Sequence, residues 1–375
     1  MTPDFDVPHV ANLHDAALAQ ALQHKIDRKT VPHGALGRLG DLARHLGAIL
    51  GTLDPRLVAP QLVVFAGDHG IVARGVSAYP SDVTWQMVGN FLAGGAAVSV
   101  LARQHGIAQT VVDCGVRHDF ARPAAGPGPT PPETPTGGSA ASEAEREGQL
   151  ASGLLIRKIG PGTQDCSSGP AMTRAQCHRA LANGIELLKG LPGNALLLGE
   201  MGIGNTSAAT LLTARLGGLD VADVTGAGTG LDAEGIARKT AVLRDALAAN
   251  AAATQPLDVL AAFGGFEVAT MVGAILQAAS ERRVIVVDGF IASAAVLVAS
   301  RLAPHVLQRC VFAHQSDERG HARLLQLLQA APLMQLGMRV GEGSGAALAW
   351  PLLVSACAIL NEMASFESAG VSDKV

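Results

Sequence analysis

From about residue 61 to residue 345, short uncharged runs alternate with glycine-rich loops and with longer segments of helical periodicity. Three such runs occupy residues 61–66, 195–198 and 284–287, and a glycine follows each within two residues. Short apolar runs between turn signals suit strands that are buried on both faces of a parallel sheet. The alternation therefore predicts an α/β protein with a doubly wound, mostly parallel sheet.

The core of this protein must be built from small aliphatic side chains, because hydrophobic residues make up 48% of the chain and aromatic residues only 3%. This balance favours helices packed closely on a parallel sheet over an aromatic-rich β-sandwich. The length of 375 residues allows one large α/β domain or two smaller ones.

Three stretches outside the apolar runs have clear local signals. Leucines at helical spacing between residues 11 and 50 predict helices. Residues 172–189 predict an amphipathic helix, with Thr173 as its N-cap and Gly190 as its stop. Residues 121–149 are rich in Pro, Gly and Ser with little apolar bulk. Burial cannot offset the ordering entropy of such a segment, so we expect a flexible surface insertion without catalytic residues.

Charge and cysteine usage exclude several classes of protein. The net charge of −4 comes without any basic block, so nucleic acid is not an expected partner. Residues 343–360 are uncharged, but Gly, Pro and Ser within them favour a buried core helix over a membrane span. The five cysteines form no CxxC pair and no basic–apolar leader is evident, so we expect a soluble, cytoplasmic protein.

Near the C-terminus, residues 341–345 place Glu342 among three glycines, directly before the uncharged run. Clustered glycines suggest an unusual turn or a close backbone approach to a ligand. A carboxylate held there against an apolar wall would have a raised pKa and serve as a proton acceptor. The alternative is an exposed acid that stabilises the N-terminus of the next helix. This stretch alone does not separate the two interpretations.

A second glycine loop, at residues 199–206, joins a predicted strand to a predicted helix and contains Glu200. Backbone N–H groups in this setting bind phosphate or carboxylate well. The loop is not the dinucleotide fingerprint, because Ser207 stands where the third glycine belongs. A plain tight turn explains it equally well, with Glu200 as a structural acid. Together, however, Glu200 and Glu342 place two isolated acids at predicted neighbouring strand ends.

Three other polar positions have residue types that suit chemistry. Lys239 lies about two helical turns beyond a third glycine loop, at residues 226–230, and suits a phosphate as a point charge, although most helical lysines are simply solvated. Asp68 and His69 have no matching metal-ligand cluster, so we expect no metal and favour a bracing role for His69. Asp288 is a single acid without a Thr-rich phosphate loop, which disfavours a magnesium diphosphate substrate.

Several segments, taken together, resemble one family, that of the nicotinate-nucleotide–dimethylbenzimidazole phosphoribosyltransferases of cobalamin biosynthesis. The resemblance covers almost the whole chain in order, and its combination of motifs is highly specific. The segments are FAGDHG at 65–70, NFLAGGA at 90–96, EMGIGNT at 200–206, GTGLD at 228–232, GEGSGA at 341–346 and NEMA at 361–364. The segment at 121–149 looks longer than this family usually carries.

The resemblance implies transfer of the phosphoribosyl group of nicotinate mononucleotide to 5,6-dimethylbenzimidazole, giving nicotinate and α-ribazole 5′-phosphate, with inversion at the anomeric carbon. By similarity, Glu342 is the general base and Glu200 a second active-site acid. The remaining implied contacts are substrate-binding. The residues implied to contact the phosphate end of the nucleotide are Gly202, Gly204, Asn205, Gly228, Lys239, Gln315 and Ser316. Those implied to contact the aromatic base are Tyr79, Pro80, Gln86 and Met87.

The resemblance also implies a Rossmann-like α/β catalytic domain at residues 56–345 and a small helical domain formed by residues 1–55 and 346–375. It further implies a homodimer that needs no cofactor. Two other functions remain open at this stage: a nucleoside or nucleotide phosphorylase, and a non-catalytic nucleotide sensor on the same type of sheet.

Overall fold

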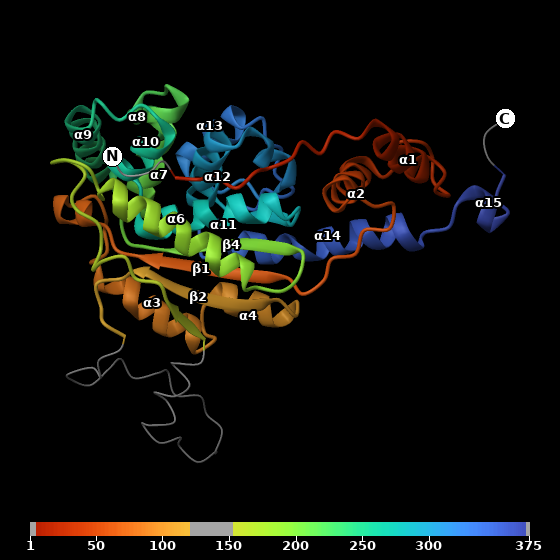
Figure 1. Ribbon diagram of the computed structural model, residues 1–375, viewed down its shortest axis with the longest axis horizontal. Coiled ribbons are helices and arrows are strands. Elements are labelled where there is room, and N and C mark those ends of the chain that lie inside the picture. Colours follow the sequence, from red (N-terminus) through yellow and green to blue (C-terminus); the bar gives the residue numbers. More distant parts are fainter. Residues whose placement is uncertain (1–4, 121–152, 373–375) are drawn as a thin grey trace, which may run out of the picture.

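A six-stranded sheet runs through the larger part of the molecule (Figure 1). The computed structural model describes residues 5–120 and 153–372, so the predicted insertion at 121–149 lies outside the described residues. Neighbouring strands pair in parallel in the order β3-β2-β1-β4-β5-β6. The strands are β1 (Gln61–Gly67), β2 (Ala108–Gly115), β3 (Leu154–Ile156), β4 (Ala195–Met201), β5 (Val284–Val287) and β6 (Cys310–Phe312). The predicted doubly wound parallel sheet is confirmed.

The strand order fixes where a ligand site belongs. From β1 the chain winds outward to β2 and β3, and from β4 it winds the other way to β5 and β6. The direction in which the chain adds successive strands therefore reverses between β1 and β4. In open α/β sheets, ligands bind at the carboxyl ends of the strands beside such a reversal.

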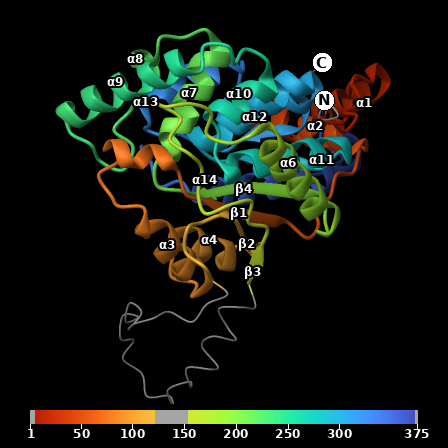
Figure 2. The same ribbon diagram turned by 60° about the vertical axis from the view of Figure 1, so that its left-hand side comes forward.

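Helices cover both faces of the sheet, as Figure 2 shows for α6 and α11 on one side and α3 and α4 on the other. Along β1, Val63 and Phe65 belong to the first core, while Leu62 and Val64 belong to the second. The first core is lined by α6 (Arg174–Lys189), α7 (Asn205–Gly217), α8 (Val221–Val224), α9 (Ala233–Ala249), α10 (Pro256–Phe263), α11 (Phe266–Ser280), α12 (Phe290–Leu302), η2 (Pro304–Arg309) and α13 (Arg319–Leu327). The second is lined by α1 (Ala16–Asp27), α2 (Gly37–Leu50), α3 (Asp82–Leu92), α4 (Ala97–Gln104) and α14 (Ser344–Glu362).

Small residues let helices of the first core touch backbone to backbone. A Cβ atom added to Gly184 of α6 would lie 1.9 Å from the carbonyl oxygen of Thr270 in α11. The aromatic-poor composition is thus used for close helix packing, as predicted. The predicted cap of α6 is also confirmed: Thr173 and Gln176 form a reciprocal capping box, and Gly190 ends the helix.

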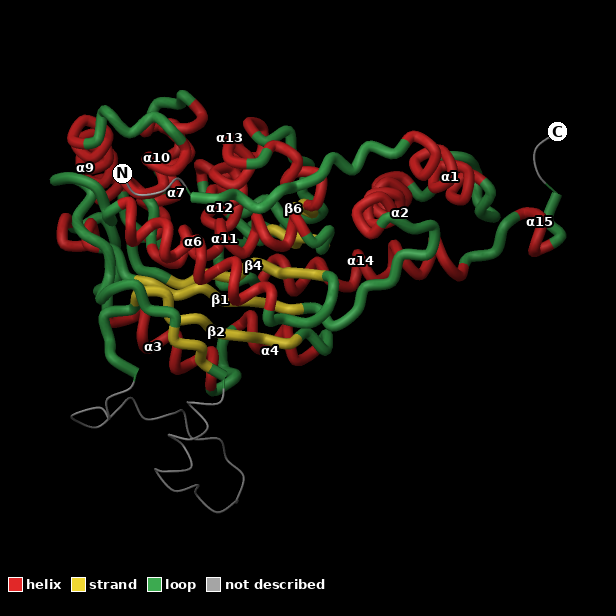
Figure 3. Tube along the Cα trace, viewed as in Figure 1, coloured by secondary structure: helices red, strands yellow, loops and turns green. Residues whose placement is uncertain are grey.

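Helices from near the two ends of the chain, α1, α2, α14 and α15 (Phe366–Ala369), gather beyond one end of the sheet (Figures 1 and 3). Lys29 forms a β-bridge with Ser365, and the backbone N–H of Phe366 donates to the carbonyl of Arg28 at 3.0 Å. The segment before α1 lies instead across the larger unit, where Phe5 and Val7 pack against the first core. Helix α14 connects the two parts, because it starts at the strand ends and runs outward to this junction.

By length and composition alone, Ser344–Glu362 and Asp82–Gln104 would each be able to cross a membrane. Burial accounts for the apolar composition of one face of α14, whereas Leu352 and Val354 on the rest of the helix are 37% and 44% exposed. Ala346, Leu353 and Leu360 have no exposed surface, and they pack in the second core beneath the sheet. The expected buried core helix is therefore present at this position.

Candidate functional site

A cavity of about 230 Å³ opens at the carboxyl ends of β4, β5 and β6. It lies where the sheet order predicts a ligand site. The eight expected site residues that line it are Tyr79, Met87, Glu200, Gly202, Asn205, Gly228, Ser316 and Glu342. The five expected residues outside its lining are Pro80, Gln86, Gly204, Lys239 and Gln315.

Glu342 stands in a strained loop at the cavity wall. Its backbone has φ +66°, a left-handed conformation that costs a non-glycine residue roughly 1–2 kcal/mol. Its Oε2 is buried without a hydrogen-bond partner. Burial raises the pKa of the Glu342 carboxyl and Asp288 raises it further, while the Val98 N–H at the start of α4 lowers it in part. The side chain is therefore a partly desolvated carboxyl with one free oxygen, as a proton acceptor requires.

The expected placement of Glu342 at a strand end is wrong. Residues 335–341 before it form no strand, and Gly337 and Gly341 among them have positive φ. A Cβ atom at Gly341 would lie 2.6 Å from Oε1 of Glu200. The glycine thus permits a close approach between the loop and the end of β4. This approach brings Glu342 next to Glu200 although no strand precedes Glu342.

Glu200 is the penultimate residue of β4 and is 7% exposed. Its Oε1 accepts a hydrogen bond from the backbone N–H of Glu342 at 3.3 Å, and its Oε2 accepts one from the side-chain amide of Asn205. Burial and the nearby Asp288 raise the pKa of Glu200 to about 7. The carboxyl can therefore change protonation state near neutral pH.

Asp288, directly after β5, was not among the expected site residues. Its Oδ2 accepts from the N–H of Gly343 at 3.2 Å and its Oδ1 from the N–H of Ala346 at 3.1 Å. These N–H groups belong to the first turn of α14 and the residue before it, so Asp288 holds the loop of Glu342 in place. A single acid directly after an apolar run was the available signal, but its partners lie 55 and 58 residues away in sequence.

Lys239 lies behind the cavity wall rather than in solvent. It is 0% exposed, and its Nζ donates to Oγ1 of Thr206, a cavity-lining residue, at 2.9 Å. Desolvation lowers the pKa of Lys239 to about 8, partly offset by Glu318. On the same side, Nη1 of Arg339 donates to the carbonyl of Gly228 at 3.2 Å. Two cations therefore flank the glycine loops, and Arg339 had no distinguishing sequence signal.

Ser316 is positioned by a buried histidine. Its backbone N–H donates to Nδ1 of His321 at 2.9 Å, and Nε2 of His321 lies 3.1 Å from Oγ of Ser293. Desolvation lowers the pKa of His321 to about 3, so the ring is neutral and Nδ1 is free to accept. Gln315, the neighbouring expected residue, is attached instead to Met334, whose carbonyl accepts its backbone N–H at 2.9 Å.

The apolar part of the cavity lining is here called the apolar wall. It contains Tyr79 and Met87, both expected, together with Val83, Met201 and Val340. Tyr79 and Val340 are 51% and 50% exposed. Such a lining suits a flat aromatic ligand, with the polar groups of the cavity fixing its orientation.

No group of three or more His, Cys, Asp or Glu side chains suitable for a metal occurs in residues 5–120 and 153–372. Asp68 and His69 are instead used internally. Asp68 accepts from the backbone N–H of Arg117 at 2.8 Å, and His69 pairs with Glu267. This arrangement agrees with the bracing role favoured for His69.

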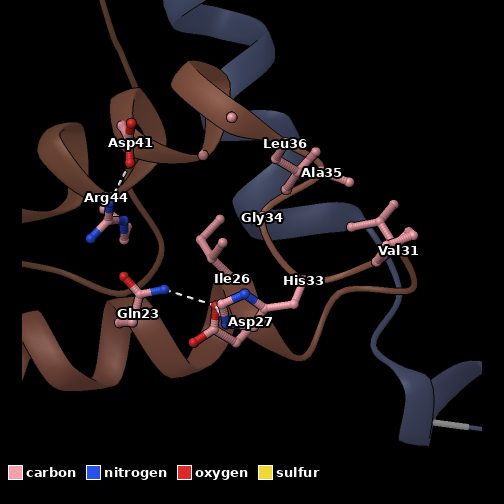
Figure 4. A pocket seen from close by; sticks show the side chains of 13 residues that line it. Gln23, Ile26, Asp27, Val31, His33, Gly34, Ala35, Leu36, Asp41 and Arg44 are labelled. Carbon is pink, nitrogen blue, oxygen red and sulfur yellow. Dashed lines mark hydrogen bonds and ion pairs between the residues drawn. The ribbon is translucent and has the colours of Figure 1, made fainter. Parts of the chain in front are cut away.

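A second cavity, of about 160 Å³, lies between α1 and α2 (Figure 4). Its acids are already paired. Oδ1 of Asp27 lies 3.2 Å from Nε2 of His33 and accepts from the amide of Gln23 at 2.8 Å, and Asp41 pairs with Arg44. We therefore assign no chemistry to this cavity.

Comparisons with known proteins agree with this geometry. A phosphoribosyltransferase family model matches residues 11–371. A nicotinate-nucleotide–dimethylbenzimidazole phosphoribosyltransferase from Variovorax paradoxus (strain S110) is 63% identical over 369 residues, which cover 98% of this chain and 97% of the relative. One from Dechloromonas aromatica (strain RCB) is 51% identical over 369 residues, covering 97% and 98%. The crystal structure of the enzyme of that name from Thermus thermophilus superposes with a TM-score of 0.83 at 38% identity, covering 96% of this chain and 100% of the other.

Proposed function

The chain belongs to the nicotinate-nucleotide–dimethylbenzimidazole phosphoribosyltransferase family, and from that premise we propose that it transfers the phosphoribosyl group of nicotinate mononucleotide to 5,6-dimethylbenzimidazole. The products are nicotinate and α-ribazole 5′-phosphate, which serves the lower ligand of cobalamin. The observation that carries the proposal is the pairing of Glu200 and Glu342 at one cavity wall, with Lys239 behind another.

The leaving group activates the bond that breaks. In the nucleotide, the ring nitrogen of nicotinate is bonded to the anomeric carbon and carries a positive charge. When this bond breaks, the nitrogen keeps the bonding electrons and becomes a neutral pyridine nitrogen. Charge that develops on the ribosyl carbon is stabilised by nearby carboxylates. Glu200 and Glu342 are the acids available in the cavity lining for this purpose, with Glu318 farther along the same lining.

Glu342 completes the reaction as general base. One nitrogen of dimethylbenzimidazole forms the new bond to the anomeric carbon, and the N–H proton of the other ring nitrogen passes to the Glu342 carboxylate. The raised pKa of Glu342 and its unpartnered Oε2 support this role, because the carboxylate is more basic than an exposed one and is not already engaged. The apolar start of α14 supports exclusion of water, a competing nucleophile.

The phosphate end of the nucleotide is assigned to the glycine loops. Gly202, Asn205 and Gly228 line the cavity there, and Asn205 is the first residue of α7. A helix N-terminus stabilises a phosphate, and the buried Lys239 adds a cation one hydroxyl away, at Thr206. The aromatic base is assigned to the apolar wall with Tyr79 and Met87.

The wider organisation is proposed on separate grounds. We infer a small helical domain from residues 1–55 and 346–375 and a catalytic domain from 56–345. The bridge between Lys29 and Ser365 supports this division. The segment before α1 and the inner face of α14 pack on the larger unit instead, so they join the two domains. The five cysteines are free thiols, which suits a reducing cytoplasm. A homodimer is proposed from the resemblance alone.

The decisive experiment measures nicotinate released from nicotinate mononucleotide when dimethylbenzimidazole is added without metal. Stoichiometric nicotinate and ribazole phosphate support the proposal. Release that needs orthophosphate in place of the base would assign a phosphorylase, and binding without release would assign a sensor.

A further inference from the structure

A buried histidine–glutamate pair lies directly behind the loop at the end of β4. His69 follows β1, and Glu267 lies in the first turn of α11. Nε2 of His69 is 2.7 Å from Oε1 of Glu267, and the two side chains are 3% and 0% exposed. Neither residue lines the strand-end cavity, so neither touches a substrate bound there.

The surroundings of the pair favour the protonated form of His69. Burial lowers the pKa of His69, but the carboxylates of Glu267, Asp68 and Glu200 together raise it above its ordinary value. The N-terminus of α11 stabilises the negative charge of Glu267. A buried ion pair adds little net stability, because desolvation of its two charges offsets their attraction. Stability alone is therefore a poor reason for the pair at this place.

Glycines from separate loops pass so close to the pair that an added side chain would crowd it. A Cβ atom added at Gly265 would lie 2.5 Å from Cε1 of His69, and one at Gly67 would lie 2.6 Å from Oε2 of Glu267. Added Cβ atoms at Gly202 and Gly204 would lie 3.4 Å from Nε2 and 3.2 Å from Cβ of His69. The same added atoms would lie nearer still to the carbonyl oxygen of Gly67, at 2.4 Å from Gly202, and to Cγ2 of Val72, at 2.6 Å from Gly204. The loop of residues 202–205 thus rests on His69 together with these neighbours and has little room to sink away from the cavity.

We propose that the His69–Glu267 pair is a positioning device that sets the height of the loop of residues 202–205 above the sheet. Through this loop it places Asn205, whose amide donates to Oε2 of Glu200, and the N-terminus of α7. Glu267 and His69 therefore affect the reaction indirectly, through the position of this loop. The kinetic consequence rests on the proposed function, whereas the loop geometry does not.

Glu267→Gln tests the proposal, because it keeps the volume and an acceptor for His69 but removes the charge. We expect kcat/KM for nicotinate mononucleotide to fall by about tenfold to a hundredfold, since a misplacement of about 1 Å away from the chemistry can cost that much. The KM for dimethylbenzimidazole should stay within about twofold, because the apolar wall is untouched. Hydrogen exchange of the backbone amides of residues 202–207 should accelerate.

Asp113→Asn is the matched control. It makes the same chemical change at a carboxylate that is also 0% exposed, at the end of β2, but outside the cavity lining. We expect this variant to be less stable than the unmodified protein without a change in nucleotide kcat/KM or in exchange at 202–207.

A folded Glu267→Gln variant with unchanged kcat/KM and unchanged exchange would overturn the proposal, as would equal changes in Asp113→Asn. If Glu267→Gln does not fold, Glu267→Asp decides by the same two readings, because it keeps the charge and draws the carboxylate back by one methylene. Exchange needs no substrate. Failure of the unmodified protein to release nicotinate would therefore refute the proposed function while leaving the exchange comparison valid.

Discussion

The strand-end cavity and the cavity between α1 and α2 are of similar size but differ in how their polar groups are satisfied. Their volumes are about 230 and about 160 Å³. In the first, Glu342 keeps an unpartnered Oε2 and a left-handed backbone, and Glu200 has a pKa raised to about 7. In the second, Asp27 and Asp41 are each paired with a neighbouring side chain.

The comparison teaches that the state of the polar groups separates the two cavities more clearly than their volumes do. Buried groups left without partners and backbone held in a costly conformation reduce stability, so they are retained where they serve chemistry. Acids that are already paired near the surface have no such requirement. Four predictions, taken from the largest expected effect to the smallest, test whether the two cavities differ in this way.

Glu342→Gln should lower turnover by about 10³-fold, or about 4 kcal/mol, because an amide cannot accept the benzimidazole proton. Binding of nicotinate mononucleotide should be nearly unchanged, because the side chain keeps its shape. Single-turnover release of nicotinate and calorimetric binding measure the two quantities. Turnover within about tenfold of the unmodified enzyme would remove Glu342 as the base.

As pH rises from about 4.5 to about 7, Glu200 should lower the free energy of unfolding by about 3 kcal/mol, whereas the lowered pKa of His321 raises it over part of the same range. The sign follows from the raised pKa, because the folded state favours the protonated carboxyl. The contribution of Glu200 to stability is fully present below the pKa of the unfolded state and is lost as pH rises to the pKa of the folded state. Urea unfolding at several pH values measures the slope.

Glu200→Gln should flatten this part of the profile, because it removes the titrating group from both states. Asp68, Asp113 and Glu342 also have raised pKa values and shift stability in the same direction, so the difference between variant and unmodified protein isolates Glu200. An identical slope in the two proteins would contradict the assignment.

Lys239→Ala should weaken binding of nicotinate mononucleotide by about 30-fold, or about 2 kcal/mol, as expected for a lost hydrogen bond to a charged group. The matched ligand is nicotinate riboside, which lacks the phosphate and should bind both proteins equally. Calorimetric Kd values for the two ligands measure the effect. Equal Kd values for the nucleotide would exclude a phosphate role for Lys239.

Asp27→Asn should change the free energy of unfolding by less than about 1 kcal/mol, as is usual for an exposed ion pair. Because the α1–α2 cavity has no assigned chemistry, kcat/KM should be unaffected. Urea unfolding and the transfer assay measure both. A large loss of activity in a stable variant would show that paired acids in this cavity also serve the reaction, and the contrast between the cavities would fail.

Local signals explain why so much of the fold and part of the site are predictable. A short apolar run followed by glycine marks β1, β4 and β5 whatever lies elsewhere in the chain, and the Thr173 cap needs only its own turn. Likewise, Glu342 and Glu200 stand out because glycines flank them in sequence.

Long-range partners explain the rest. In the sequence Asp288 is a lone acid, and only the fold places the first turn of α14 against it. His69 likewise shows no partner in the sequence, because Glu267 lies 198 residues later. Lys239 has the spacing of a solvated helical lysine, and only packing shows that it is buried. Such pairings depend on the order of the strands, which no single stretch of sequence contains.

Helix α14 has a consequence for how the protein loses activity on heating. It begins one residue after Gly343, where Asp288 fastens the loop of Glu342, and runs for 19 residues toward the junction of the chain ends. A helix of that length spans roughly 28 Å, and Pro351 in its interior removes one backbone hydrogen bond along the way. Loosening at the distant junction would disturb the packing of the helix and, through it, the loop of Glu342. Inactivation should therefore precede the loss of the sheet, and a clamp joining the two chain ends should raise the temperature at which turnover is lost.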